Sequence, residues 1–435
     1  MTISHKSEKE HTKLPGIFRS FQYRNYRLFF AGQSLSLIGT WIQQIALPWL
    51  VYHITGSPIW LGVVGFATQI PIFLLAPFAG VLTDRWNRLR ILITTQTLAM
   101  VQAFILALLY YTHVIHIWHI IVLGIFLGIV NAFDMPSRQS LVIKLVEKRE
   151  DLGNAIALNS SMVNAARLIG PSIAGVLVAV TSEGFCFLLN GVSFFFVIIS
   201  LLMMNLKTIP AKNLTSRMKD ELTKGFSYVF RFVPLRNIIL LLALVSLMGS
   251  SYAVLMPVFT KEVLHGSSAT FGFLMASSGF GALVGAFYLA SRKKLVGLES
   301  FIPLSAFLFG IGLVSVALTR VMTLSAMSML IVGFGMTTGM ASSNTIIQTI
   351  TDDDKRGRVM SFYTMAFIGT VPFGSLLAGT LAHRLGAPHT LMIGGSACIL
   401  GAAIYLANLS AMKRIIQPVY ERLGLMHQKK NVRGQ

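Results

Sequence analysis

The stretch GVLTDRWNRLR, residues 80–90, is a short cationic turn between two long apolar runs. The first apolar run, residues 59–82, overlaps the start of the turn, and the second, residues 91–111, follows directly after it. Each run is long enough to cross a bilayer, because the hydrocarbon core takes about 20 residues of apolar helix. The turn is therefore expected at a membrane face. Short cytoplasmic loops are enriched in Lys and Arg, so its three arginines predict that this face is the cytoplasmic one.

The composition of the whole chain is that of a membrane protein. Of the 435 residues, 54% are hydrophobic and 12% are charged, whereas a soluble domain has about 25% charged residues. We predict an all-α integral membrane protein with twelve transmembrane helices in two six-helix halves. The expected spans are residues 28–52, 59–82, 91–111, 117–136, 155–180, 185–206, 237–259, 270–290, 301–319, 324–347, 359–381 and 389–409.

The net charge of +20 follows the topology of these spans. Of the 36 Lys and Arg residues, 32 fall in the two tails or in alternate loops, and one of the other four, Arg167, lies within a span. Alternation of this kind is the positive-inside pattern, and it predicts that both termini are cytoplasmic. The same charge in a soluble protein would indicate nucleic-acid binding, but no groove-reading or base-stacking module accompanies it. We therefore expect no nucleic-acid partner.

A long polar stretch, residues 207–236, separates the two halves. Within it, Met218, Leu222, Phe226 and Val229 recur at helical spacing with charges between them, which predicts an amphipathic helix on the cytoplasmic surface. A disordered linker is the alternative. The expected organisation is an N-terminal cytoplasmic tail (1–27), a first half (28–206), a cytoplasmic linker (207–236), a second half (237–409) and a basic cytoplasmic tail (410–435).

The turn at 80–90 resembles the loop between helices two and three of the major facilitator superfamily. The matching positions are Gly80, Leu82, Asp84, Arg85 and Arg88, whereas Asn87 replaces the usual glycine and Leu89 the usual basic residue. The resemblance implies two six-helix halves related by an axis along the membrane normal. It also implies a substrate site between the halves, near the midplane of the membrane.

Further runs resemble the bacterial branch that contains enterobactin exporters and macrolide efflux proteins. They are residues 131–139, 154–160 and 164–175 in the first half, and 356–361, 369 and 372–379 in the second. This resemblance implies an exporter in the bacterial inner membrane, driven by the proton-motive force, that carries a siderophore, drug or similar amphiphile. Two alternatives stay open: a flippase or uptake transporter for a lysophospholipid-like substrate, and a transport-inactive membrane sensor or assembly subunit.

The resemblance also implies a cytoplasmic gate at the inner ends of spans two to four. We expect Asp84, Arg88 and Asp134 to form a relay that locks the outward-open state, with Gly80, Arg85 and Arg90 in the same element. The alternative is that these loop charges only set the topology. Asp134 is the deepest acid in the spans, which makes it the candidate proton carrier. Asp84 is the competing carrier.

Span five contains Gly170, Pro171 and Gly175. Small residues let membrane helices approach closely, and neighbouring groups can bond the backbone that proline leaves free. The run is similar to the antiporter motif of the superfamily, so we expect span five to pack against the other half and close the outer side of the pathway. An ordinary proline kink is the alternative.

Polar side chains inside spans are costly against lipid, so they mark the expected pathway or bonds between helices. Arg167 lies about 20 Å along span five, past the midplane. Two roles for Arg167 stay open. It contacts an anionic group of the substrate, or it is paired structurally with neighbours such as Asn164 and Asn190. The candidates for the substrate cavity are Gln33, Gln44, Gln69, Asn131, Asn159, Asn164, Arg167, Tyr252 and Asn344.

Other kinds of site find little support in the sequence. His113, His116 and His119 lie near a predicted outer turn without Cys or carboxylate partners, so we expect no metal there. Nucleophile–base pairs and a Walker loop are absent from the sequence, so we expect neither an enzyme nor an ATP-driven pump. The expected partners are a small-molecule substrate, protons and the lipid bilayer; we expect no cofactor and a monomer.

Overall fold

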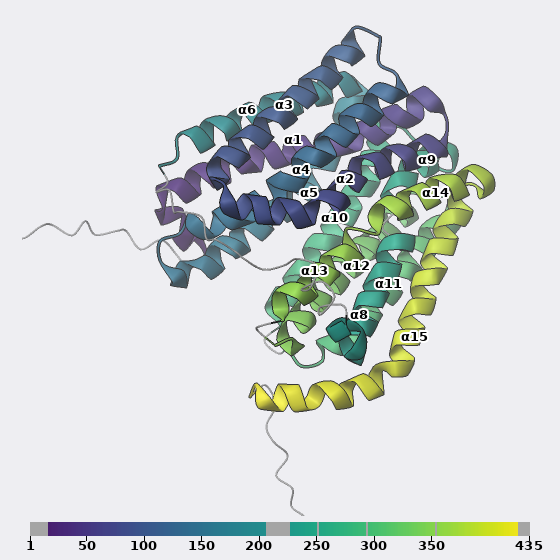
Figure 1. The fold of residues 1–435 in the computed structure, drawn as a ribbon. Helices are drawn as coiled ribbons and strands as arrows, with labels where there is room; N and C mark the ends of the chain where they lie inside the picture. Colours follow the sequence, from purple (N-terminus) through teal and green to yellow (C-terminus); the bar gives the residue numbers. More distant parts are fainter. Residues whose placement is uncertain (1–15, 206–226, 250–251, 293–294, 353–354, 425–435) are drawn as a thin grey trace, which may run out of the picture.

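The computed structural model describes residues 16–205, 227–249, 252–292, 295–352 and 355–424, which form helices joined by short turns (Figure 1). The first half consists of η1 (Gly16–Gln22), α1 (Arg24–Thr55), α2 (Pro58–Arg85), α3 (Arg88–Tyr111), α4 (Ile117–Lys144), η2 (Arg149–Asp151), α5 (Leu152–Val180) and α6 (Glu183–Leu202). The second half consists of α8 (Val233–Leu244), the π-helical turn η3 (Val245–Gly249), α9 (Tyr252–Glu262), α10 (Ser268–Ser291), α11 (Leu298–Leu318), α12 (Met322–Ile350), α13 (Arg356–Phe367), α14 (Val371–Leu385) and α15 (Ala387–Arg422).

The predicted count of twelve spans is confirmed, since the described residues contain twelve helical segments long and apolar enough to cross a membrane. Two spans of the second half are composite: α8 to α9 make one of them and α13 to α14 another. The turn between α1 and α2 is short, because glycine and proline end one helix and begin the next. Gly56 ends α1 with a φ of 59°, and Pro58 opens α2 directly after it.

The C-terminal helix is longer than the sequence pattern suggested. Residues 410–422 were expected to be part of a tail, but α15 continues through them to Arg422 and lies across the end of the second half (Figure 1). Its last turns bury Met412, Ile416 and Tyr420, which are spaced four residues apart. Most of the predicted amphipathic linker helix lies outside the described residues; the part that the structure describes is helical over residues 227–231.

The two halves repeat the same packing. In the first half α2 packs on α4, α3 on α6, and α3 on α4. The equivalent helices of the second half pair in the same way: α10 packs on α12, α11 on α15, and α11 on α12. This repetition is what a bundle built from two parallel repeats requires.

The halves are joined mainly by two helix pairs, α5 with α10 and α2 with α14, and α9 makes smaller contacts with α1 and α2. Both pairs approach closely where glycines face each other. A Cβ atom on Gly175 would lie 2.8 Å from the Cα of Gly272, and one on Gly62 would lie 3.0 Å from the Cα of Gly379. Side chains at these positions would separate the helices, so the glycines set the distance between the halves.

We call the two faces of the bundle the basic end and the opposite end. The basic end carries η1, the turn between α2 and α3, η2, the turn between α10 and α11, and the C-terminal turns of α15. The opposite end carries the turn between α1 and α2 and the end of α9. Figure 1 shows the two halves inclined to each other, meeting near α2, α9 and α14 and diverging toward the basic end.

Candidate functional site

The halves meet at the opposite end through side chains of α1. The hydroxyl of Tyr52 donates a hydrogen bond to the carboxylate of Glu262, the last residue of α9. The Lys261 ammonium lies 5.5 Å from the centre of the Tyr52 ring. Trp49, one turn earlier in α1, stacks on Phe271 of α10 with ring centres 5.9 Å apart. These contacts close the bundle at the opposite end.

Helix α5 continues the contact toward the middle of the bundle. Gly175 and the carbonyl of Pro171 face Gly272, and the Ser268 hydroxyl donates to the carbonyl of Gly175 at 3.3 Å. Gly170 faces Trp41 of α1, within its own half. The predicted motif therefore makes two contacts: Pro171 and Gly175 lie against the second half, and Gly170 lies against the first.

Arg167 is the one predicted cavity residue that the described contacts place against both halves. Its guanidinium lies 5.9 Å from the centre of the Trp41 ring in α1 and donates to the Met336 sulfur in α12 at 3.6 Å. Within the described part of the chain it has no acidic partner. The proposed neighbours are bonded elsewhere, because Asn164 donates to the Ser160 carbonyl at 3.0 Å and Asn190 donates to Gln43 at 2.8 Å.

Asp134 is 3% exposed and lies in α4 against α3. One carboxylate oxygen accepts hydrogen bonds from the Thr95 hydroxyl at 2.9 Å and the Gln96 amide at 2.7 Å, and the other lies 2.9 Å from the Arg138 guanidinium. Thr95 comes seven residues after Arg88, which places it about 10 Å farther along α3. The partners of Asp134 on α3, Thr95 and Gln96, therefore lie deeper in the bundle than the start of that helix.

The other predicted gate residues lie at the junction of α2 and α3. Gly80, Asp84 and Arg85 fall in the last turns of α2, where the structure describes the backbone only. Arg88 opens α3 and is half-buried, whereas Arg90 is exposed. Asn87, which replaces the usual glycine, caps α3: its side chain accepts from the amides of Leu89 and Arg90 at 3.0 and 3.3 Å.

No hydrogen bond among the described residues links the remaining cavity candidates to one another. Tyr252 is buried in the second half, with its hydroxyl 3.0 Å from that of Ser278. Asn344 accepts a hydrogen bond from Gln348, in the same helix. Gln33 is buried and Gln44 is exposed, whereas Gln69, Asn131 and Asn159 are half-buried. A fully internal amide cluster is formed by Gln43, Gln102 and Asn190, which tie α1, α3 and α6 together.

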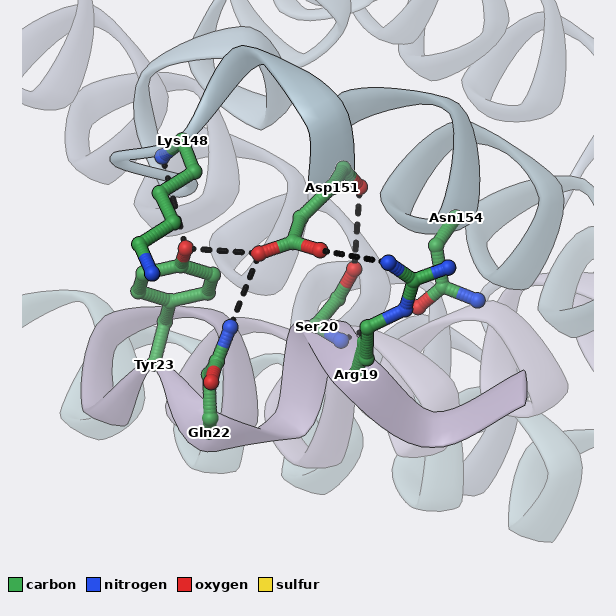
Figure 2. A network of polar contacts seen from close by, with 7 residues as sticks. All are labelled: Arg19, Ser20, Gln22, Tyr23, Lys148, Asp151 and Asn154. Carbon is green, nitrogen blue, oxygen red and sulfur yellow. Dashed lines mark hydrogen bonds and ion pairs between the residues drawn. The ribbon is translucent and has the colours of Figure 1, made fainter. Parts of the chain in front are cut away.

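Sequence reasoning missed a polar network at the basic end, which Figure 2 shows around Asp151. The buried carboxylate accepts hydrogen bonds from Gln22 and Tyr23, each at 2.8 Å, and lies 3.8 Å from the Arg19 guanidinium. Ser20 donates through its backbone amide to Asn154 at 3.0 Å. Burial, with the bond to Asp151, raises the pKa of Tyr23 above its usual value. The network fixes η1 to the start of α5.

Known proteins are similar to this chain in sequence over most of its length. A staphyloferrin A transporter of Staphylococcus aureus is 30% identical over 374 residues, which cover 86% of this chain and 93% of that protein. Macrolide efflux protein A of Streptococcus pyogenes is 21% identical over 394 residues, which cover 88% and 96%.

Solved structures agree on the fold. A POT family transporter in complex with 5-aminolevulinic acid superimposes with a TM-score of 0.73 at 12% identity, over 90% of this chain and 97% of that one. An inward-facing bacterial homologue of the human lysosomal transporter Spinster gives 0.66 at 13% identity, over 93% and 99%. The family model described as transmembrane secretion effector matches residues 16–422. The chain is therefore a multi-pass membrane protein that belongs to the transmembrane secretion effector family of the major facilitator superfamily.

Proposed function

We propose that this protein is a secondary active exporter that moves a small amphiphilic molecule out of a bacterial cytoplasm by alternating access, acting as a monomer. The observation that carries the proposal is the contact between the halves. Glycine-lined helix pairs and the Tyr52–Glu262 hydrogen bond join the halves at the opposite end, while the halves diverge toward the basic end. In an alternating-access cycle, a state joined in this way takes up substrate from one side of the membrane only.

The distribution of charge supports the assignment of that side. Lys and Arg collect in loops on the cytoplasmic face of inner-membrane proteins, and 32 of the 36 lie in the tails or in loops of the basic end. With the basic end in the cytoplasm, both termini are cytoplasmic and substrate enters from the cytoplasm. Export then requires the halves to close at the basic end and part at the opposite end.

The surroundings of Arg167 support an anionic group on the substrate. Its guanidinium stays charged throughout the cycle and can bind a carboxylate or phosphate through two parallel hydrogen bonds. Trp41 offers an aromatic face beside it and Met336 an adaptable thioether. The staphyloferrin A transporter and macrolide efflux protein A are named for a siderophore and for macrolides. We propose a small amphiphilic cargo, and the position of Arg167 favours one that carries an acidic group.

The surroundings of Asp134 support proton coupling. A buried carboxylate that pairs with Arg138 and accepts bonds from Thr95 and Gln96 joins α4 to α3. Its protonation would remove the charge that holds the Arg138 guanidinium and would weaken the bonds from Thr95 and Gln96 that join the helices. Asp84 and Arg88, at the end of α2 and the start of α3, complete the proposed gate on the strength of the family resemblance. Asp84 remains the competing proton carrier.

The function can be tested in an efflux-deficient bacterial strain that expresses the protein. We expect faster release of preloaded staphyloferrin A, or a raised minimal inhibitory concentration of a macrolide, compared with the strain carrying an empty vector. Faster uptake with no release would favour an importer or lysophospholipid flippase. If neither release nor uptake of a panel that includes these compounds and a labelled lysophospholipid changes, the transport-inactive reading is favoured and the exporter proposal is wrong.

A further inference from the structure

A cavity of about 570 Å³ lies at the basic end of the second half. Its walls come from two parts of the chain that the transport mechanism above does not use. One is the helical segment 227–231, which leads from the linker into α8, and the other is the start of α13. The second wall belongs to the run 356–361, one of the runs that carry the family resemblance. The proposed cycle gives that run no role.

The cavity is strongly cationic. Arg231, Lys355 and Arg358 all line it. Lys355 is paired with Asp352 at 2.9 Å, and Asp352 also lies 3.5 Å from Arg422. Arg231 and Arg358 have no acidic partner within the described residues. Two guanidinium groups from different segments therefore line one cavity with no acidic partner among the described residues, which favours an anionic ligand.

The remaining walls are aromatic and apolar. The rings of Tyr228 and Phe232 lie nearly parallel, with centres 6.4 Å apart and an interplanar angle of 16°. The Lys355 ammonium lies 4.6 Å from the centre of the Tyr228 ring. Val359 is fully buried at the cavity. A ligand for this cavity needs a compact anionic group for the guanidinium groups and an apolar portion for the rings.

We propose that this cavity binds a phosphate-bearing anion, supplied by the headgroup of an anionic phospholipid in the leaflet at the basic end. Guanidinium groups bind phosphate oxygens through paired, charge-assisted hydrogen bonds. Basic pockets beside transmembrane helices on the cytoplasmic side suit anionic headgroups, because the acyl chains stay in the bilayer. A bound headgroup would hold the end of the linker against the start of α13 and so fix the linker to the second half.

The binding can be measured on the purified full-length protein in detergent by native mass spectrometry. The probes are dioleoyl-phosphatidylglycerol, zwitterionic dioleoyl-phosphatidylcholine and inorganic phosphate. We expect the wild type to bind phosphatidylglycerol at least about tenfold more tightly than phosphatidylcholine, because both carry a phosphodiester but the guanidinium groups repel the choline cation of phosphatidylcholine. The double variant R231Q/R358Q should lose this preference. R320Q is the matched control, because Arg320 is exposed in the turn between α11 and α12, at the opposite end.

The outcomes separate the sources of the anion. Loss of the preference in the double variant, with R320Q unchanged, supports a lipid headgroup. If inorganic phosphate competes with phosphatidylglycerol at equal concentration, the cavity takes a soluble phosphate and the phosphate chemistry stands. Equal phosphatidylglycerol binding by the wild type and the double variant overturns the proposal. The single variant R231Q provides the same test if the double variant does not fold, because the Arg231 side chain is exposed. Lipid binding is read without transport, so this result is independent of the exporter proposal.

Discussion

The hydroxyl of Tyr52 in α1 donates a hydrogen bond to the carboxylate of Glu262 in α9, and this bond joins the two halves at the opposite end. Tyr52 is buried at 5% exposure, and Glu262 is exposed at the rim of the contact. In an exporter whose open side is the basic end, this bond must break each time the protein turns outward. It therefore contributes to the balance between the two states.

Replacing Tyr52 with Phe should shift that balance toward the state open at the opposite end. One lost hydrogen bond is worth about 1 kcal/mol, or roughly a fivefold change in the ratio of the two states. Spin labels at Ser182 and Arg320, one in a turn of each half at the opposite end, should report longer distances in Tyr52→Phe. Tyr288→Phe is the control, since Tyr288 is exposed and no hydrogen bond of its hydroxyl is found within the described residues. An unchanged distance distribution in Tyr52→Phe would show that the bond has no part in closure.

Gly175→Val should prevent the halves from meeting along α5 and α10. Even the Cβ atom would lie 2.8 Å from the Cα of Gly272 and 2.9 Å from the Ser268 carbonyl, so the backbones must separate. Overpacking of this kind costs about 1–3 kcal/mol. Transport should fall at least about tenfold, while Gly153→Val on the same helix should transport normally, because a Cβ there meets nothing within 4 Å. Equal transport by the two variants, at equal membrane abundance, would contradict the role of this contact.

Arg167→Lys should raise the KM for an anionic cargo by about tenfold, since lysine keeps the charge but loses the paired geometry of the guanidinium. A neutral macrolide should be affected much less, because it offers no anionic group to Arg167. Transport kinetics for one cargo of each kind give the comparison, and Arg320→Lys serves as the control. If both cargoes lose transport equally, Arg167 has a structural role at the contact with Trp41 and Met336. If neither changes, it lies outside the pathway.

Asp134→Asn should uncouple transport from protons. The amide cannot be ionised, so it cannot release a proton or hold the Arg138 guanidinium by charge, although Thr95 and Gln96 can still bond to it. Proton flux that accompanies substrate export, followed with a pH-sensitive dye in vesicles, should disappear. Asp352→Asn, in the turn before α13, should leave the flux unchanged. Normal proton flux in Asp134→Asn would move the coupling role to Asp84.

The sequence predicts those features of the protein that depend on residues close together in the chain. Apolar runs of about 20 residues gave the spans, and alternating Lys and Arg gave their proposed orientation. The helical end of α15 carried a readable signal as well, because Met412, Ile416 and Tyr420 share one face. The charged residues between these three indicated that the segment does not cross the membrane. An amphipathic helix at the membrane surface accounts for both the charges and the shared apolar face.

The contacts that matter most depend on how distant helices are rotated against each other. Arg138 lies four residues after Asp134, a spacing at which a pair can be anticipated. The bonds from Thr95 and Gln96 require α3 to present one particular face to α4, which the sequence does not specify. Likewise, the depth of Arg167 could be predicted from its place in the span. Its contact with Trp41 depends on how α5 is rotated against α1, and its contact with Met336 depends on how the two halves meet.

The central claim is that the protein takes up its cargo at the basic end and exports it at the expense of the proton-motive force. Its most direct measurement is uptake of staphyloferrin A and of a macrolide into inverted membrane vesicles, whose cytoplasmic face is turned outward. The proton-motive force of the cell is directed inward, so the interior of the inverted vesicles must be acidified to reproduce it. Under this gradient the account predicts that at least one cargo accumulates in the vesicles. The accumulation should collapse when an uncoupler is added and should be absent in Gly175→Val. Accumulation no greater than in vesicles without the protein, or accumulation that persists with the uncoupler, would contradict the account.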